Sequence, residues 1–510
     1  MPHLQKSQFH EQLATMLNFI DTLGYLNSTL LISIILVVLL WIRSRRPTHF
    51  PPGPTPFPII GNFHTLVKGD LFKVMRGLRK EYGDIFSLSL GKQWVTVING
   101  NENLRELLVK RADVTTDRPS CFVFRQGKNK GIVSASGSSW KQQRAFAVSK
   151  LRDFGFGKRS FESSVSEEVE QLCNLINSFN GKSFDISGII HTSISNNVMS
   201  ITVGRRFDYD DPKFQQFVYL LNENAKNSAL VGPLNFAPFL RKIPGDPFGA
   251  KQISNNVRET FKFFRTEINE HEKTLDTDNL RDFIDIYLKE IKNQEEEETS
   301  EFTAGQLLTI MADLFVAGTE TTATTIRWAI MYLLNNMDIQ KKMHKEIEDV
   351  IGSGRPPCMS DKPNLPYCEA VILESLRLGN VVPYALPHKA SDDIVYKGFT
   401  IPKDSIILPS LDSVAFDENL FPDAHSFKPE RFIDENGRLC GQDKVLSFSL
   451  GRRVCLGEAL ARMELFLYIT SLVQRFEFLP KEGNNPPAIK GNLGVTYCPE
   501  AFEFRAVSRS

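Results

Sequence analysis

The sequence predicts a mainly α-helical protein with small β-sheets, preceded by one N-terminal transmembrane helix. Three observations predict this. The chain has 510 residues, of which 42% are hydrophobic and 24% charged, enough for a large buried core. Apolar residues recur mostly with the helical period, with strand-like alternation at residues 85–98 and 394–401. One long apolar run lies near the N-terminus.

Charge and cysteine content narrow the class of protein. The 60 basic residues balance the 60 acidic residues, which gives no case for nucleic acid as a partner. The seven cysteines are scattered without a C-x-x-C pair, which argues against a disulfide framework or a structural zinc site. We therefore expect most of the chain to face a reducing compartment.

The apolar run covers residues 26–42 and predicts a membrane anchor. Its part from Leu30 to Ile42 has Ser33 as its one polar residue, and its length is at the short end of the roughly 17–25 residues of a spanning helix. The arginines that follow favour a cytoplasmic position for the rest of the chain and a lumenal one for residues 1–25. A cleaved signal peptide is the alternative, but bulky and charged residues follow where small cleavage-site residues belong.

Residues 43–58 form a basic and proline-rich hinge. Pro51-Pro52-Gly53-Pro54-Thr55-Pro56 cannot form helix, because proline lacks the amide donor and restricts the residue before it. This composition predicts a stiff spacer. No comparable linker follows, so residues 59–510 are expected to form one large domain.

A long helix is predicted from Thr303 to Asn335. Thr303 and Gln306 match a capping box, and apolar residues then recur at helical spacing over roughly 50 Å. Its middle, Ala317-Gly318-Thr319-Glu320-Thr321-Thr322, is unusual because glycine and hydroxyl residues weaken a buried helix. Small residues would admit a flat ligand, and a hydroxyl beside a carboxylate can hold water and pass protons. A kink with back-bonded threonines is the alternative.

A second cluster surrounds Cys455, in Phe448-Ser-Leu-Gly-Arg-Arg-Val-Cys-Leu-Gly457, and leads into a helix-forming run from Glu458 to Leu472. Amide groups at a helix start lower the pKa of a thiol and favour an anionic ligand. Arg453 would offer its guanidinium to a carboxylate. A buried structural cysteine is the alternative for any single cysteine.

These residues resemble a known family. F-x-x-G-x-R-x-C-x-G is the haem-binding signature of cytochrome P450 monooxygenases, and every fixed position is present from Phe448 to Gly457. Other motifs follow the family order from the proline hinge to the C-terminal region: W-x-x-x-R at Trp140 and Arg144, the oxygen-activating helix at Ala317–Thr322, E-x-x-R at Glu374 and Arg377, and P-E-R-F at Pro429–Phe432. In its anchor, its proline hinge and the stretches Leu314–Thr322 and Phe448–Leu467, the chain resembles the microsomal family 2 enzymes.

The resemblance implies haem b (iron protoporphyrin IX) with Cys455 as the axial ligand of its iron, and O2 as co-substrate. It implies propionate contacts from Trp140, Arg144 and Arg453, and close contact of the haem with Ala317, Gly318 and Phe448. Thr321, assisted by Glu320, would deliver protons. Glu374, Arg377 and Arg431 would form a buried charge triad, although a surface ion pair is the simpler reading of Glu374 and Arg377 alone.

It also implies electrons from NADPH through a cytochrome P450 reductase, with cytochrome b5 as a candidate second donor. The expected location is the endoplasmic reticulum membrane, single-pass, with the catalytic domain on the cytoplasmic face. Lys141, Lys150 and Arg452 are candidates for a basic docking face or ordinary solvated side chains.

The substrate pocket is nominated by position and is expected to suit lipophiles such as a fatty acid, steroid, terpenoid or xenobiotic. Its candidate residues are Phe122, Phe124, Asp313, Ala317 and Val382. A haem-binding sensor or electron carrier, a membrane scaffold and a reductase-independent peroxide isomerase are the alternatives.

Overall fold

The computed structural model describes residues 15, 27–35, 45–66, 69–91, 93–121, 129–153, 159–227, 232–294 and 300–509. The chain forms two compact units. The first contains residues 1–96 and 395–401, and the second contains residues 97–394 and 402–510. The expected fold class, mainly α with small β-sheets, is confirmed.

The first unit is small and carries the strand-like stretches expected from the sequence. Its elements are α2 (Phe63–Leu66), α3 (Leu71–Tyr82), β1 (Ile85–Leu90), most of β2 (Gln93–Ile98), most of β5 (Ile394–Tyr396), and β6 (Phe399–Ile401). β1 neighbours β2, and β5 neighbours β6.

The proline-rich segment is bonded along β1 rather than standing apart as a spacer. The Ser87 amide donates to Pro52 O at 2.6 Å, and its hydroxyl donates to Pro51 O at 2.7 Å. A Cβ atom on Gly53 would lie 2.0 Å from Ser87 O, so only glycine allows this approach. Proline has no amide N–H to donate, but the carbonyl groups of Pro51 and Pro52 accept from Ser87 of β1.

The predicted anchor is described in part. Residues 27–35 are helical, and their large apolar side chains, such as Leu30 and Ile32, are about 60% exposed. Residues 26 and 36–42 lie outside the described part of the chain. Within the described residues, no helix combines the length and the apolar character needed to cross a bilayer.

The second unit holds the remaining elements. Its longer helices are α7 (Gly137–Asp153), α8 (Arg159–Ser178), α9 (Ser187–Thr202), α10 (Pro212–Asn227), α11 (Ala250–Thr274), α12 (Phe283–Asn293), α13 (Ala304–Asn335), α14 (Met337–Val350), α15 (Pro366–Gly379) and α17 (Glu458–Arg475). Its short helical segments are α4 (Asn101–Arg105), η1 (Glu106–Lys110), α5 (Ala112–Thr115), η2 (Gly232–Asn235), η3 (Pro238–Lys242), η4 (Lys362–Asn364), α16 (Asp412–Ala415), η5 (Pro429–Phe432), η6 (Gln442–Lys444) and η7 (Gly451–Arg453).

Its strands are short and antiparallel. They are β3 (Ser183–Phe184), β4 (His388–Lys389), β7 (Ile406–Pro409), β8 (Phe476–Pro480), β9 (Gly491–Leu493), β10 (Tyr497–Pro499) and β11 (Phe504–Ser508). β11 pairs with both β3 and β8, β10 pairs with β9, and β4 pairs with β7.

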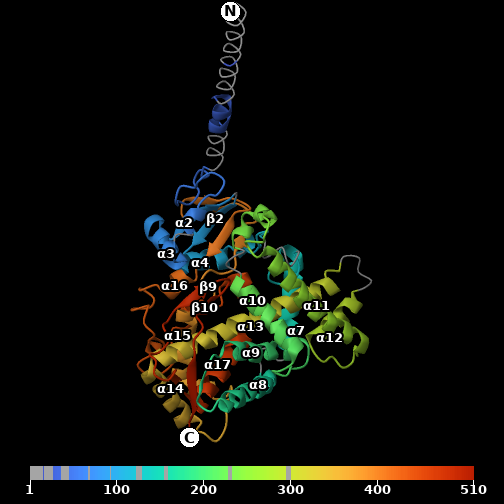
Figure 1. Ribbon diagram of the computed structural model, residues 1–510, viewed down its shortest axis with the longest axis vertical. Coiled ribbons are helices and arrows are strands. Elements are labelled where there is room, and N and C mark those ends of the chain that lie inside the picture. The colour runs from blue at the N-terminus through green and yellow to red at the C-terminus, as the bar shows by residue number, and fades with distance from the viewer. Residues whose placement is uncertain are drawn as a thin grey trace, which may run out of the picture. The chain divides into compact units, whose positions relative to one another are not determined.

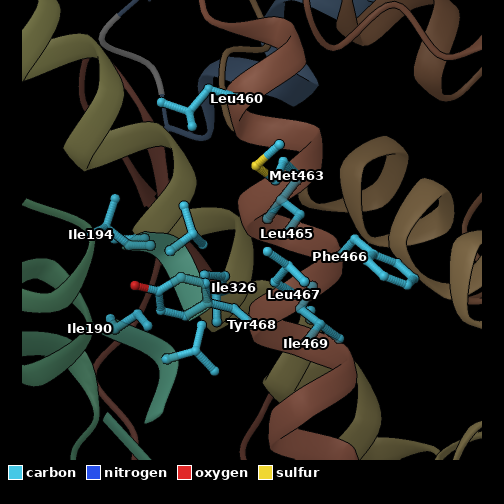
Figure 2. Close-up of a cluster of buried hydrophobic side chains, with 14 of the residues drawn as sticks. Ile190, Ile194, Ile326, Leu460, Met463, Leu465, Phe466, Leu467, Tyr468 and Ile469 are labelled. Atoms are coloured by element: carbon cyan, nitrogen blue, oxygen red, sulfur yellow. The ribbon is translucent and has the colours of Figure 1, made fainter. Parts of the chain in front are cut away.

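α13 is the central element of the second unit (Figure 1). It packs against α9, α11, α15 and α17, and most of its residues are buried. Figure 2 shows part of this core, where Ile326 of α13 lies between Ile190 and Ile194 of α9 and the apolar residues of α17. Burial over most of its length explains why α13 carries apolar residues on nearly all sides.

The start of α13 agrees with the predicted cap, but only half of the capping box forms. The Thr303 hydroxyl accepts from the Gln306 amide at 3.2 Å. The Gln306 side chain instead accepts from the Gly131 amide at 2.7 Å and donates to the Ser139 hydroxyl at 2.9 Å. Gln306 therefore joins α13 both to the loop before α7 and to the first turn of α7.

Candidate active site

A cavity of about 280 Å³ lies in the second unit beside the middle of α13. The Cys455 loop forms one wall, and residues 381–388 and 132–133 contribute others. Apolar side chains such as Leu314, Val382 and Leu386 line much of it. A mostly apolar cavity with a few convergent polar groups is the usual form of a small-molecule site.

The loop before α17 presents Cys455 to this cavity. The Cys455 amide donates to Phe448 O at 2.9 Å, which closes the loop, and the side chains of both residues line the cavity. Gly451 has φ +75°, and a Cβ atom there would lie 1.9 Å from Leu108 O in η1. The glycine is required because the loop backbone packs directly on another backbone.

The electrostatics of Cys455 differ from the expectation. Burial raises the pKa of its thiol, although the amides of Gly457 and Glu458 donate to the sulfur and Arg144 lies nearby. The expectation of a lowered thiol pKa was wrong for the protein alone, because the desolvation of the thiolate outweighs the effect of these amides and of Arg144. A bound metal cation favours the thiolate directly.

A group of basic side chains gathers at the same cavity: Arg118, Arg144, Arg453 and His388. Burial, with Arg118 and Arg144 nearby, lowers the pKa of Arg453 to about 8. Burial and Arg118 hold the pKa of His388 well below its usual range. Such mutual repulsion is relieved by an anion.

The donors of this group are partly used. The Arg453 guanidinium donates to Thr116 O, Ile132 O and Ala135 O, and Arg144 donates to Val454 O at 2.6 Å. Arginine has five N–H groups, and within the described residues three of those on Arg453 have acceptors, which leaves two for a further partner. Arg453 and Arg144 can therefore still bind a carboxylate.

Trp140 lies against Arg453, with 3.9 Å between Arg453 Cζ and the centre of the indole ring. Its Nε1 is buried and has no hydrogen-bond partner within the described structure. Trp140 itself is not among the described residues that line the cavity. A buried donor without an acceptor, beside a group of cations, fits the two propionates of a haem.

Ala317, Gly318 and Thr321 of α13 line the cavity, as does Asp313. The Thr321 hydroxyl donates to Ala317 O at 2.7 Å, so the back-bonding weighed as an alternative is present together with exposure to the cavity. A Cβ atom on Gly318 would lie 3.0 Å from Val198 Cγ2, so close packing on α9 also favours glycine.

Glu320 and Thr321, the expected acid and alcohol pair, have different surroundings in the structure, and their catalytic role stays a prediction. Glu320 is not among the described residues that line the cavity. Its carboxylate lies 3.0 Å from His191 Nε2 and accepts from Thr496 at 3.1 Å and from Cys498 at 3.2 Å. Burial raises the pKa of Glu320, but these partners outweigh it and lower the pKa to about 2. Neighbouring helical residues point about 100° apart, and packing directs Glu320 toward α9 and β10.

Asp313 supports the cavity wall. Its carboxylate accepts from the amides of Ile132 and Val133, at 2.7 and 2.9 Å. Burial raises the pKa of Asp313 to about 6, against the lowering effect of these two amides. Asp313 thus holds the loop whose carbonyl groups bind Arg453.

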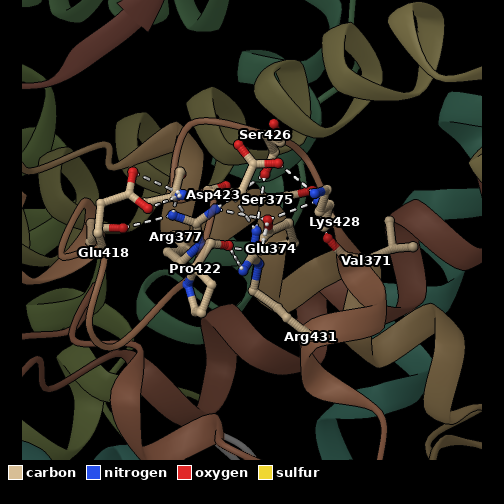
Figure 3. A network of polar contacts seen from close by, with 12 residues as sticks. Val371, Glu374, Ser375, Arg377, Glu418, Pro422, Asp423, Ser426, Lys428 and Arg431 are labelled. Carbon is tan, nitrogen blue, oxygen red and sulfur yellow. Dashed lines mark hydrogen bonds and ion pairs between the residues drawn. The ribbon is translucent and has the colours of Figure 1, made fainter.

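Glu374, Arg377 and Arg431 lie together away from the cavity (Figure 3). Arg377 donates to both carboxylate oxygens of Glu374, at 2.8 and 2.7 Å, and Arg431 Nε donates to the same carboxylate at 3.0 Å. The side chains of Glu374 and Arg377 are 0% exposed, so they are not a surface ion pair. Arg377 also donates to Ala415 O and Ala424 O, which ties α15 to the segment before η5.

The sequence did not point to some of the residues that line the cavity, and two of the residues that it did nominate lie outside the described part of the chain. Arg118, His388 and Glu464 line the cavity, but no sequence motif singled out Arg118 or His388. Glu464 had a signal, because it interrupts an apolar run in α17. Phe122 and Phe124 lie outside the described residues.

Residues 51–505 match the family model "Cytochrome P450". Mouse cytochrome P450 2E1 is 36% identical over 94% of this chain and 97% of its own length. Human cytochrome P450 2U1 is 37% identical over 91% of this chain and 90% of its own length. Rabbit cytochrome P450 2C3 is 37% identical over 92% of this chain and 97% of its own length. The chain therefore belongs to the cytochrome P450 family, which implies haem and dioxygen, and is a cytochrome P450 monooxygenase.

Proposed function

We propose that this protein is a haem-thiolate monooxygenase that inserts one oxygen atom of O2 into a lipophilic substrate, with Cys455 as the iron ligand. The observation that carries the proposal is the position of the Cys455 sulfur on a mostly apolar cavity that also has a concentration of arginine side chains. Haem held by a thiolate supplies the cleavage of dioxygen.

The residues of the chain have separate roles in this proposal. Arg144, Arg453 and Trp140 hold the propionates, and an anion there also favours the protonated form of His388. Thr321 keeps its hydroxyl oxygen on the cavity wall, where it accepts a hydrogen bond from solvent or substrate. The apolar walls exclude bulk water.

A lipophile is the substrate class that the cavity suits. Leu314, Val381 and Val382 are among its apolar wall residues. An acidic side chain of the wall near them, Asp313, accepts from two backbone amides with its Oδ2 atom. Hydroxylation or epoxidation of a fatty acid, steroid, terpenoid or xenobiotic fits these walls.

Electrons would come from NADPH through a cytochrome P450 reductase, with cytochrome b5 as a second donor. Lys141 and Arg452 are exposed, and Lys141 follows Trp140 while Arg452 precedes Arg453. We place the protein in the endoplasmic reticulum membrane, anchored by residues 26–42 with the catalytic domain on the cytoplasmic face. The apolar run at residues 26–42 and the arginines that follow it support this location.

The test is product formation by the full chain in lipid, with NADPH, purified reductase and dioxygen labelled with the heavy oxygen isotope. Lipophiles are screened first by the spectral change of the haem on binding. The expected result is a product with one labelled oxygen, formed only with NADPH and reductase. Turnover of an organic peroxide without NADPH, and no labelled product, would instead support a peroxide isomerase.

Anchoring is tested separately. Deletion of residues 1–42 is expected to move the protein from the alkali-resistant membrane fraction to a fraction that alkali or salt releases. A matched deletion of residues 1–25 retains the apolar run and should leave the protein in the membrane. Membrane retention by both variants would contradict the anchor.

A further inference from the structure

Glu464 is a buried acid at the wall of the cavity. It lies on α17, one side of which packs on α13, and it is 1% exposed. Both Glu464 and its neighbour Thr322 line the cavity. The position is unusual, because buried carboxylates are normally paired with a cation.

The groups that face Glu464 are neutral. Asn197 Nδ2 of α9 donates to Glu464 Oε1 at 3.0 Å, and Thr322 of α13 also hydrogen-bonds to the carboxyl group. On α17 itself, Tyr468 lies one turn away. None of these partners within the described chain is a cation. Burial therefore raises the pKa of Glu464 to about 8, and the two hydrogen bonds lower it only in part.

Glu464 thus differs from Glu320, the acid that the sequence motif had suggested. Glu320 is held on His191, Thr496 and Cys498, and its pKa is lowered to about 2, so it has no proton to give at neutral pH. Glu464 holds a proton at neutral pH and lies at the cavity wall.

A chain of polar side chains leads from Glu464 toward the surface. Asn197 Nδ2 also donates to the Tyr468 hydroxyl at 3.0 Å, and this hydroxyl lies 2.8 Å from Ser193 Oγ. Ser193 hydrogen-bonds to Glu168 of α8. Figure 2 shows the Tyr468 hydroxyl directed from α17 toward α9.

The outer end of the chain, Glu168, is 3% exposed and lies beside side chains that reach solvent. Glu168 accepts from Tyr209 and from Arg206, whose side chain is 32% exposed. Arg206 in turn lies 3.6 Å from the 82% exposed Asp208. The inner members Ser193, Asn197 and Tyr468 are each at most 1% exposed.

The amide of Asn197 positions its neighbours and does not itself carry the proton, because both its N–H groups donate. Glu464 Oε1 and the Tyr468 hydroxyl oxygen both accept from Asn197 Nδ2, so these two oxygens are no more than about 6 Å apart. One water molecule can bridge that distance. Asn197 Oδ1 is buried and has no partner among the described residues, so it can accept from that water.

We propose that Glu464 donates protons to the cavity through the Thr322 hydroxyl and is re-protonated from solvent along Tyr468, Ser193 and Glu168. The inference rests on the proposed function, because an enzyme that releases one oxygen atom of O2 as water consumes protons. The Glu464 O–H bond breaks as Thr322 passes its own proton to an acceptor in the cavity and takes the one from Glu464. The carboxylate then takes a proton from the bridging water, which takes one from Tyr468, and the proton of Tyr468 is replaced from Ser193, Glu168 and finally solvent.

The first test is infrared difference spectroscopy of the full-length holoenzyme in detergent, without substrate or reductase. The C=O stretching band of a protonated carboxylic acid is expected at neutral pH and should titrate with a midpoint of about 8. Glu464→Gln should remove this band. Glu369→Gln is the matched control, since Glu369 is also buried but is paired with Lys362 at 3.0 Å, and it should leave the band in place.

The second test measures how fast that band shifts after transfer to heavy water. Tyr468→Phe keeps the buried ring and removes the hydroxyl, so the exchange of the Glu464 proton should slow. Tyr332→Phe is the control, because Tyr332 is buried in α13 outside the polar chain, and exchange should match the wild type. If Glu464→Gln does not fold, the Tyr468→Phe comparison still tests the path.

The functional measurement is the coupling of O2 consumption to product formation. With reductase and NADPH, Glu464→Gln should release a larger share of consumed O2 as hydrogen peroxide than Glu369→Gln. A band that survives in Glu464→Gln, or equal exchange rates in Tyr468→Phe and Tyr332→Phe, would overturn the proposal. The infrared band and its exchange rate are measured without turnover. A failure of the proton path can therefore be distinguished from a failure of the proposed monooxygenase activity.

Discussion

Removal of Arg377 from the buried triad tests the energetics of the fold most sharply. Arg377→Met retains an apolar stem but leaves the 0% exposed Glu374 carboxylate with Arg431 and the Lys428 amide as its remaining partners. Loss of one member of a buried pair costs about 3–5 kcal/mol. The carbonyls of Ala415 and Ala424 also lose their donor, at about 1–3 kcal/mol each if they stay dry.

The expected total, about 5 kcal/mol or more, is comparable to the whole stability of a marginal protein. We expect Arg377→Met to accumulate poorly or to lack haem. Arg431→Met, whose side chain is 10% exposed, should cost less because Arg377 still binds Glu374. It therefore remains measurable where Arg377→Met fails to fold.

The assay is urea unfolding of the full chain in detergent, followed by circular dichroism. Lys481→Met is the matched control, since Lys481 and Glu503 are 49% and 47% exposed and such pairs contribute about 0–1 kcal/mol. The order of loss should be Arg377→Met, Arg431→Met, Lys481→Met. An Arg377→Met loss no larger than that of Lys481→Met would refute the reasoning.

The remaining predictions concern the site. Trp140→Phe should speed haem transfer to apomyoglobin about tenfold, by losing one charge-assisted hydrogen bond, with unfolding in urea little changed. His191→Ala should destabilise the protein by about 1.5–3 kcal/mol at neutral pH. Because the pKa of Glu320 is lowered in the folded protein, its ionised carboxylate contributes stability at pH values above the ordinary pKa of a glutamate, and this contribution is lost as the pH falls toward about 2. The difference in unfolding free energy between wild type and His191→Ala should therefore shrink in acid, measured by urea unfolding. Glu464 contributes stability at low pH that is lost as the pH rises toward about 8, and Glu464→Gln should flatten that dependence in the same assay.

Elements with a strong local signal were predictable from the sequence. α13 begins after Thr303 and ends at Asn335, as its cap and apolar periodicity predicted. The strand-like stretches became β1, β2, β5 and β6. In such segments the periodicity reports burial directly.

The direction of single side chains was less predictable. A motif places Glu320 next to Thr321, but the packing of α9 and β10 decides which face of α13 each one occupies. Arg118 and His388 come from distant segments and meet only in the folded chain, so no local pattern pointed to them. The pKa of Cys455 depended on desolvation, which sequence cannot supply.

Ligation of the haem iron by the Cys455 thiolate is tested most directly by the carbon monoxide difference spectrum of the reduced full-length protein. Wild type is compared with Cys455→Ala and with Cys440→Ala, a control in a partly exposed cysteine. Thiolate ligation by Cys455 predicts a strongly red-shifted Soret band in wild type and Cys440→Ala, and its loss in Cys455→Ala. A folded, haem-containing wild type with only the unshifted band, or a red-shifted band that survives in Cys455→Ala, would contradict it.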